Sequence, residues 1–224
     1  MKSLIVFTVL LFNSFLYSQS PIEINVGDFD EVKVYDLIEV NLIKSNENKV
    51  IIKGNDSEDV EIINKDGKLK IRMKLDKIFD GVETFVAVYY SNLDIIDGNE
   101  GSFIASNEII EQDKITLKAQ EGARIKVALN VEHLEVRAVT GGVVETRGIA
   151  INQDIVINTG GNYEGKLLET KNTNVKIQAA GEASVNATDI VDVNVKAGGE
   201  VYIYGNPKKV NEKTILGGNI YHRK

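Results

Sequence analysis

The sequence predicts an all-β fold, a β-solenoid with coils of about 20 residues, because one phrase recurs along its C-terminal half. The phrase is clearest over residues 193–203, where two stretches of alternating apolar and polar residues flank a pair of glycines. It returns, with small changes, at 136–144, 155–163, 175–185 and 216–221. The second small residue of each copy is Gly142, Gly161, Gly181, Gly199 or Gly218, at intervals of 19, 20, 18 and 19 residues, and Gly122 and Gly101 extend the series backwards at intervals of 20 and 21.

Alternation within the phrase predicts which side chains form the core. Every second side chain of a strand lies on the same face. We call the second small residue of each copy the anchor glycine. The residues six, four and two places before it, and two places after it, are apolar or small, as in Val193, Val195, Ala197 and Val201 around Gly199. In the other copies Thr140, Thr159 or Ala179 takes the place of Ala197. We therefore expect Val195 to be buried and Lys196 to face water. Stacked coils would bury a continuous apolar column that no single copy could bury alone.

The anchor glycines suit a bend where the backbone turns sharply or comes close to its neighbour. A leucine-rich repeat has a similar period, but its L-x-x-L-x-L-x-x-N signature is absent. A β-solenoid is therefore the preferred architecture.

Residues 1–20 form the first element in chain order and read as a secretory signal peptide. Lys2 gives the segment a basic start, and residues 4–16 form an apolar run that is too short to span a bilayer. Residues 18–20 supply small residues for cleavage. No second apolar run reaches membrane-spanning length. The chain has no cysteine, which excludes a disulfide framework, thiol chemistry and lipid attachment at a cysteine. We expect a protein exported to the periplasm, the cell surface or the extracellular medium.

The part that follows is expected to hold additional strands and hairpins before the regular coils. The predicted strands are 31–34, 38–42, 50–53, 60–63, 69–75 and 84–90. Residues 64–67 (NKDG) predict a tight hairpin turn, because glycine after aspartate accepts the positive φ that such turns need. Helical periodicity is nearly absent and no linker stands out, so residues 21–224 are expected to form one solenoid domain.

Three stretches together resemble a known bacterial family. They are Asp28–Val34 (DFDEVKV), Asp66–Ile71 (DGKLKI) and the glycine-pair coils, which end in GGEVYIYGNP and GGNI. In these the chain is similar to the putative auto-transporter adhesin, head GIN domain family, over about residues 28–221. The resemblance implies a right-handed parallel β-helix and brings no catalytic motif. The chain departs from the family at residues 36–40 (DLIEV), where a small-residue turn is commoner, and at Ala179-Ala180-Gly181, which stands in place of a Ser/Gly pair.

Residues that could carry catalysis or bind metal are few, and no cofactor is expected. His133 and His222 lie far apart without the spacing of a metal site, so both are interpreted as solvated. Asp94, Asp97, Asn99 and Glu100 could supply oxygen ligands to calcium, but they do not follow the EF-hand spacing, and the turn interpretation is preferred. Asn152 and Asn172, each nine residues before an anchor glycine, are expected to stack as a short asparagine ladder.

Charge and motif content leave three classes of function. The formal net charge is −7, with acidic and basic residues interspersed, which argues against a nucleic-acid partner. A binding module that contacts a glycan or an envelope protein through the outer solenoid wall ranks first. A structural or scaffolding envelope protein ranks second. A carbohydrate-active enzyme ranks third, because no aligned column is expected to concentrate the carboxylates that it needs. The sequence leaves the oligomeric state open.

The preferred contact surface is a column of tyrosines. Tyr202 and Tyr221 each follow an anchor glycine by three residues, so they should stack on the outside, and Tyr204 should point the same way. Exposed tyrosines suit sugar rings and protein partners, because they are apolar and also hydrogen-bond. The alternative is that they only stabilise the last coils and shield an open sheet edge.

Overall fold

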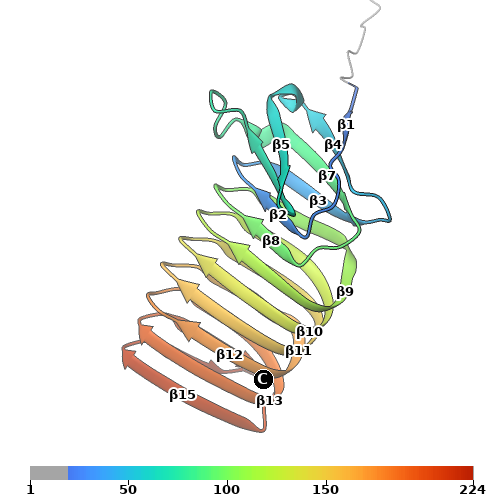
Figure 1. Cartoon of the computed structure of the whole chain (residues 1–224). Helices are drawn as coiled ribbons and strands as arrows, with labels where there is room; N and C mark the ends of the chain where they lie inside the picture. The colour runs from blue at the N-terminus through green and yellow to red at the C-terminus, as the bar shows by residue number, and fades with distance from the viewer. Residues whose placement is uncertain (1–19, 224) are drawn as a thin grey trace, which may run out of the picture.

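A computed structural model describes residues 20–223, which form a stack of β-coils (Figure 1). Most of the predicted signal peptide, residues 1–19, lies outside the described residues, as does Lys224. The strands are β1 Ile22–Asn25, β2 Glu31–Val34, β3 Glu39–Lys44, β4 Lys49–Gly54, β5 Val60–Lys65, β6 Lys68–Met73, β7 Thr84–Tyr90, β8 Ile95–Gly98, β9 Phe103–Ala119, β10 Arg124–Val139, β11 Val143–Asn158, β12 Asn162–Ile177, β13 Glu182–Ala197, β14 Glu200–Tyr204, β15 Lys209–Leu216 and β16 Asn219–His222. Two short 3-10 helices, η1 Ser57–Asp59 and η2 Gly81–Glu83, accompany them.

The stack is the predicted β-solenoid, with about seven turns and coils of about 19 residues. Strands β9 to β13 are 16 or 17 residues long, and each pairs in parallel with the next. Figure 1 shows them as a staircase that descends to the C-terminus.

Each long strand contributes to two walls of the solenoid. The division is plainest at β13, whose residues 182–186 pair with β14 and whose residues 190–197 pair with β15. We call the face built from the first halves of β9–β13 with β3, β4, β7, β14 and β16 the leading wall. The second halves with β2, β6, β8 and β15 form the trailing wall.

The N-terminal strands enter the stack out of sequence order. Strand β2 lies between β6 and β8, and β3 lies between β7 and β9. The first coil of the chain is therefore stacked between two coils that come later in the sequence. Antiparallel strands β1, β4 and β5 close this end. The predicted hairpin is confirmed: Asp66 and Gly67, at φ 53° and 76°, join β5 to β6.

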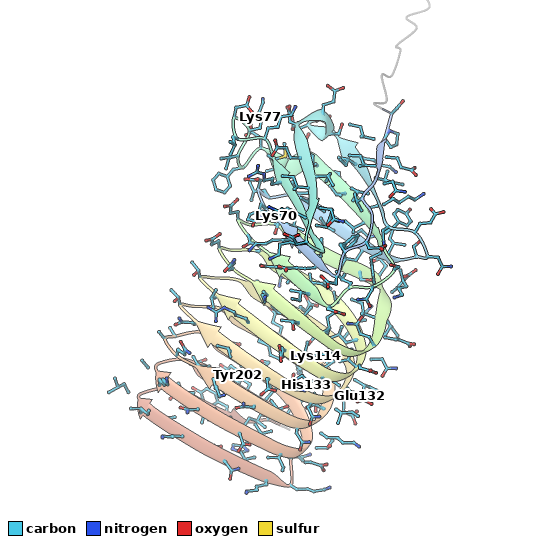
Figure 2. The ribbon with its side chains drawn as sticks, viewed as in Figure 1. Lys70, Lys77, Lys114, Glu132, His133 and Tyr202 are labelled. Carbon is cyan, nitrogen blue, oxygen red and sulfur yellow. The ribbon has the colours of Figure 1, made fainter. Side chains whose placement is uncertain are left out.

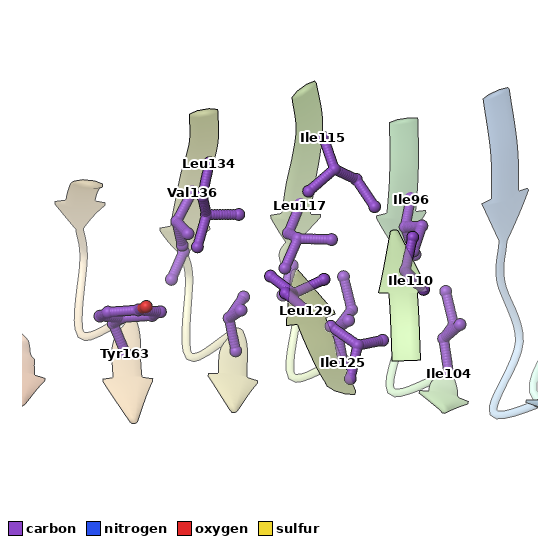
Figure 3. Packing of buried hydrophobic residues seen from close by; sticks show 14 of the residues in the cluster. Ile96, Ile104, Ile110, Ile115, Leu117, Ile125, Leu129, Leu134, Val136 and Tyr163 are labelled. Carbon is purple, nitrogen blue, oxygen red and sulfur yellow. The ribbon is translucent and has the colours of Figure 1, made fainter. Parts of the chain in front are cut away.

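The core runs between the two walls. Figure 3 shows Ile115 and Leu117 from the trailing half of β9 facing Ile125 and Leu129 on β10. Val193, Val195 and Val201 are all buried, as predicted, and Lys196 is exposed.

One predicted core column is wrong. Thr140, Thr159 and Ala179 are exposed, although the alternation placed them inside. The strands end just before them, and Thr140 and Thr159 have left-handed φ values of 49° and 51°. Alternation of faces stops where the extended backbone stops.

The turn that links successive coils needs glycine for two physical reasons. Gly141 and Gly160 have φ of 73° and 74°, a conformation in which glycine is favoured. The following glycines, Gly142 and Gly161, lack positive φ, but a Cβ on either would lie 2.1 Å from a carbonyl oxygen of the preceding coil. In the first turn Asp36 and Leu37 adopt φ of 58° and 63°, the same pair of left-handed residues that Thr140 and Gly141 form at 49° and 73°. This turn therefore departs from the family pattern in sequence while its backbone has the shape of the later turns.

A chain of hydrogen bonds crosses the core between β11 and β12. The hydroxyls of Thr146 and Tyr163 lie 2.8 Å apart, and the Tyr163 hydroxyl donates to Gln153 over 2.8 Å. Gln153 then donates to the Thr173 hydroxyl over 2.7 Å. These side chains are buried, and each gains the partner that a buried polar group needs. Gly165 makes room for this arrangement, since a Cβ there would meet the Tyr163 ring at 2.4 Å.

The C-terminal end of the stack carries polar groups at core positions. By register, Glu212 on β15 continues the column of Val193, and His222 on β16 continues the column of Ile203. Glu212 Oε1 and His222 Nε2 lie 2.8 Å apart and bridge the two walls. An inward-pointing carboxylate such as that of Glu212 discourages further strands from adding to an open edge.

Candidate functional site

The tyrosine column forms on the leading wall in the predicted register. Tyr202 on β14 pairs with Tyr221 on β16, and their rings stack with centroids 5.0 Å apart and planes 17° from parallel. The buried neighbours Val201 and Ile203 force Tyr202 outward. Figure 2 places Tyr202 among the last coils.

Two charged groups that the repeat pattern does not indicate contact this stack. The Arg223 guanidinium lies 5.2 Å from the Tyr202 ring centroid and 5.1 Å from that of Tyr221, within reach of a cation–π attraction to both. The Tyr202 hydroxyl donates a 2.5 Å hydrogen bond to Glu200. We call Tyr202, Tyr221 and Arg223 the aromatic platform.

Tyr204 continues the platform toward a groove. It points outward two residues after Tyr202, and the Lys166 ammonium lies 4.7 Å from its ring centroid. Lys166 also lines the groove described next, so the platform and the groove meet at this side chain.

A groove of about 550 Å³ crosses β9 to β13 on the leading wall. Its lining includes the small residues Ala105, Ala128 and Ser184 and the long charged side chains Lys126, Glu145, Arg147, Glu164, Lys166 and Glu182. The registers between β9 and β10 and between β11 and β12 shift beside this groove. Such irregularities change where side chains point.

Carboxylates do align in columns, contrary to the sequence expectation. Glu145 and Glu164 pair across β11 and β12 in the groove, and Glu135 pairs with Asp154 on the trailing wall. The groove carboxylates are neutralised by cations: Lys126 lies 2.7 Å from Glu145, and Arg124 lies 3.3 Å from Glu164. Each of these groove carboxylates is therefore the ion-pair partner of a basic side chain on an earlier coil.

The two histidines lie apart, as predicted, but each contacts a carboxylate. His133 Nε2 lies 3.3 Å from Asp154, and His222 contacts Glu212. In Figure 2 Lys114 and His133 lie together on neighbouring coils. Lys114 pairs with Glu135 over 2.7 Å, and this hydrogen bond lowers the pKa of Glu135 below its ordinary value.

The other predicted polar residues have structural partners. Asn172 donates to Asn152 over 2.9 Å, which confirms the asparagine ladder. Asp97 pairs with Lys33 over 3.0 Å and accepts a hydrogen bond from Asn99, while Asp94 accepts one from Asn92. The segment from Asp94 to Glu100 forms β8 and the turn after it, and its polar groups bond to different partners.

Glu200 controls the acidity of the Tyr202 phenol, which gives a first testable prediction. The hydrogen bond to Glu200, together with lost hydration, raises the pKa of Tyr202 to about 12. Because the unfolded pKa is about 10, the stabilisation from this bond is complete below pH 10 and is lost as the pH rises toward 12. We expect Glu200→Gln to return the Tyr202 pKa toward its ordinary value, measured by phenolate absorbance. Tyr202→Phe shows which part of the absorbance change belongs to Tyr202, since burial also raises the pKa of Tyr163. If the Tyr202 phenol still ionises near pH 12 in Glu200→Gln, the prediction is wrong.

Solved structures of similar shape include three from Bacteroides and Parabacteroides species. A putative adhesin from Bacteroides fragilis has a TM-score of 0.83 at 18% identity, covering 92% of this chain and 98% of that one. A putative adhesin from Parabacteroides merdae has a TM-score of 0.68 at 17% identity, with coverages of 92% and 96%. A putative lipid binding protein from Parabacteroides distasonis has a TM-score of 0.67 at 18% identity, with the same coverages. At these identities the likeness is one of fold.

Sequence comparison identifies the family. No curated protein matches the chain. The family model described as putative auto-transporter adhesin, head GIN domain, matches residues 28–207, most of the chain. The structure adds that, between residues 20 and 223, no helix has the length and apolarity to cross a membrane. The chain therefore belongs to the putative auto-transporter adhesin, head GIN domain family.

Proposed function

We propose that this chain is a non-catalytic binding protein that contacts a glycan or an envelope protein through its leading wall. The observation that carries the proposal is the aromatic platform, where two stacked tyrosines and an arginine stand beside a groove on one wall. Tyrosine and arginine are enriched at binding hot spots, because they combine apolar area with hydrogen bonding. The adhesin family to which the chain belongs supports the same class of function.

Location and processing are part of the proposal. Residues 1–20 serve as a signal peptide that is removed, and residues 21–224 form one binding domain in the periplasm, on the cell surface or outside the cell. Export would give the leading wall access to envelope or external glycans.

The test is the double variant Tyr202→Ser, Tyr221→Ser. We expect binding to whole cells or to isolated envelope glycan to fall by about thirtyfold, as for a hot spot worth about 2 kcal/mol. A stacked pair contributes about 1 kcal/mol to folding beyond its buried area, so the melting temperature should fall by only a few degrees.

Tyr35→Ser is the matched control. Its ring also carries a cation, Lys33 at 5.5 Å, but it lies at the end of β2 in the trailing wall. Lowered melting with intact binding in the double variant would mean that the tyrosines only stabilise the last coils.

Scaffolding is the second candidate, and one observation favours it. Leu75, Ile78, Phe79 and Val82 are all exposed in the segment between β6 and β7. An exposed apolar cluster of this kind suits a protein partner. It lies outside the leading wall, so a partner bound there would remain bound to the tyrosine double variant.

A further inference from the structure

A second group of aromatics lies on the leading wall, at the end opposite the aromatic platform. The strand registers align Lys53, Phe85, Glu39, Phe103 and Arg124 in one outward row across β4, β7, β3, β9 and β10. The phenyl rings thus alternate with charged side chains along the row. Phe85 is 50% exposed.

The neighbouring row carries Ile51 and Lys126 at its ends and shorter side chains between them. It places Ala87, Asn41 and Ala105 beside Phe85, Glu39 and Phe103. The result is a trough of about 390 Å³, within the size range of small-ligand sites. Phe85 and Phe103 are two strands apart, which separates them by about 10 Å.

Hydrogen-bonding groups line the same trough. Asn41, Asn107, Glu39 and Lys53 all border it, and together they offer both donors and acceptors. The amides of Asn41 and Asn107 meet only at 3.5 Å, so most of their capacity is available to a ligand. Tyr89 borders the trough as well, although the Lys49 ammonium lies 5.3 Å from its ring centroid.

We propose that this trough binds successive sugar rings of an uncharged linear glycan, an inference that rests on the proposed function and names its ligand class. The faces of Phe85 and Phe103 would stack on the apolar faces of two sugar units, and the amides and charged groups would bond their hydroxyls. The trough shares Ala105 and Asn107 with the groove that leads to the aromatic platform. A chain bound in the trough therefore has a continuous path along the wall.

Two observations favour a glycan over other polymers. The row carries both signs of charge, Lys53 and Arg124 against Glu39, so it does not select a polyanion. The trough lies on the face of paired strands, where backbone groups are already bonded, so an extended peptide has no free edge to join. Recognition must come from side chains, and aromatic faces beside amides suit hydroxyl-rich rings.

The experiment titrates the protein with cellohexaose, mannohexaose and xylohexaose by calorimetry, with an alginate oligomer as the charged comparison. We expect at least one neutral hexasaccharide to bind, and Phe85→Ala, Phe103→Ala to weaken it at least tenfold, which corresponds to about 1.4 kcal/mol. Phe79→Ala is the matched control, because Phe79 is 53% exposed but lies off this wall. Equal melting curves will show that the variants are folded.

Several outcomes would overturn the trough proposal. They are no binding of any neutral hexasaccharide at millimolar concentration, equal binding by the phenylalanine double variant, or tighter binding of alginate than of the neutral sugars. A protein partner lost in the same variant, with no sugar bound, would also overturn it. If cell binding still depends on Tyr202 and Tyr221 in any of these cases, the proposed function stands and the trough assignment alone fails.

Discussion

Val195→Asp is expected to destabilise the protein by roughly 3–5 kcal/mol, because it places a carboxylate without a partner in the apolar column. Val195 is fully buried and aligns with Ile177 on one side and Thr214 on the other. A Cβ on Gly218 would lie 2.6 Å from Val195 Cγ1, so the next turn packs directly on this side chain. Urea denaturation followed by circular dichroism measures the change.

Lys196→Asp is the matched control, since it introduces the same side chain one residue later on the outside. Lys196 is exposed, and surface substitutions usually change stability by about 0.5 kcal/mol or less. Because solenoid coils contact mainly their neighbours, unfolding of the Val195→Asp variant should begin in the last coils. Equal stability of the two variants, or a worse result for Lys196→Asp, would refute the column assignment.

The regular coils could be predicted because their information is local. Alternation fixes which side chains face inward, and a glycine pair at a nearly constant interval fixes where each coil begins. This is why Val195 and Lys196 fell on the expected sides. The same rule misplaced Thr140 and Thr159, because alternation does not report where a strand gives way to a turn with positive φ.

The N-terminal arrangement could not be predicted in this way. Asp66-Gly67 predicts a hairpin, because these two residues favour the backbone conformation of a tight turn. That β2 lies between β6 and β8 depends on which strands pair over long separations, and no local pattern records that choice.

The candidate site likewise contains residues that the repeat places and residues that only the folded structure brings together. Tyr202 and Tyr221 could be placed together because both are counted from anchor glycines. Arg223 and Glu200 complete the stack through side-chain reach. The alignment of Phe85 with Phe103 requires the register of β7, β3 and β9, which lie outside the repeat.

Gly142→Ala is expected to cost about 3 kcal/mol or more, because the added methyl group would collide with backbone that cannot move aside. Its Cβ would lie 2.1 Å from the Ala119 carbonyl oxygen and 2.4 Å from the carbonyl carbon. Gly141→Ala, one residue earlier in the same turn, provides the comparison. A Cβ on Gly141 meets nothing within 4 Å, so its cost is the φ of 73°, about 1–2 kcal/mol.

The pair separates close approach from backbone conformation as the reason for glycine at the coil turn. Urea midpoints, with the denaturant slope checked for constancy, give both free energies. If Gly141→Ala proved the more costly, backbone conformation would be the dominant constraint, and the coils would have room for the Gly142 methyl group that the 2.1 Å contact of its Cβ rules out. The expected order, with Gly142→Ala far worse, would mean that the distance between coils is set at these glycines. That spacing in turn fixes the register that brings Tyr202 over Tyr221 and aligns Phe85 with Phe103.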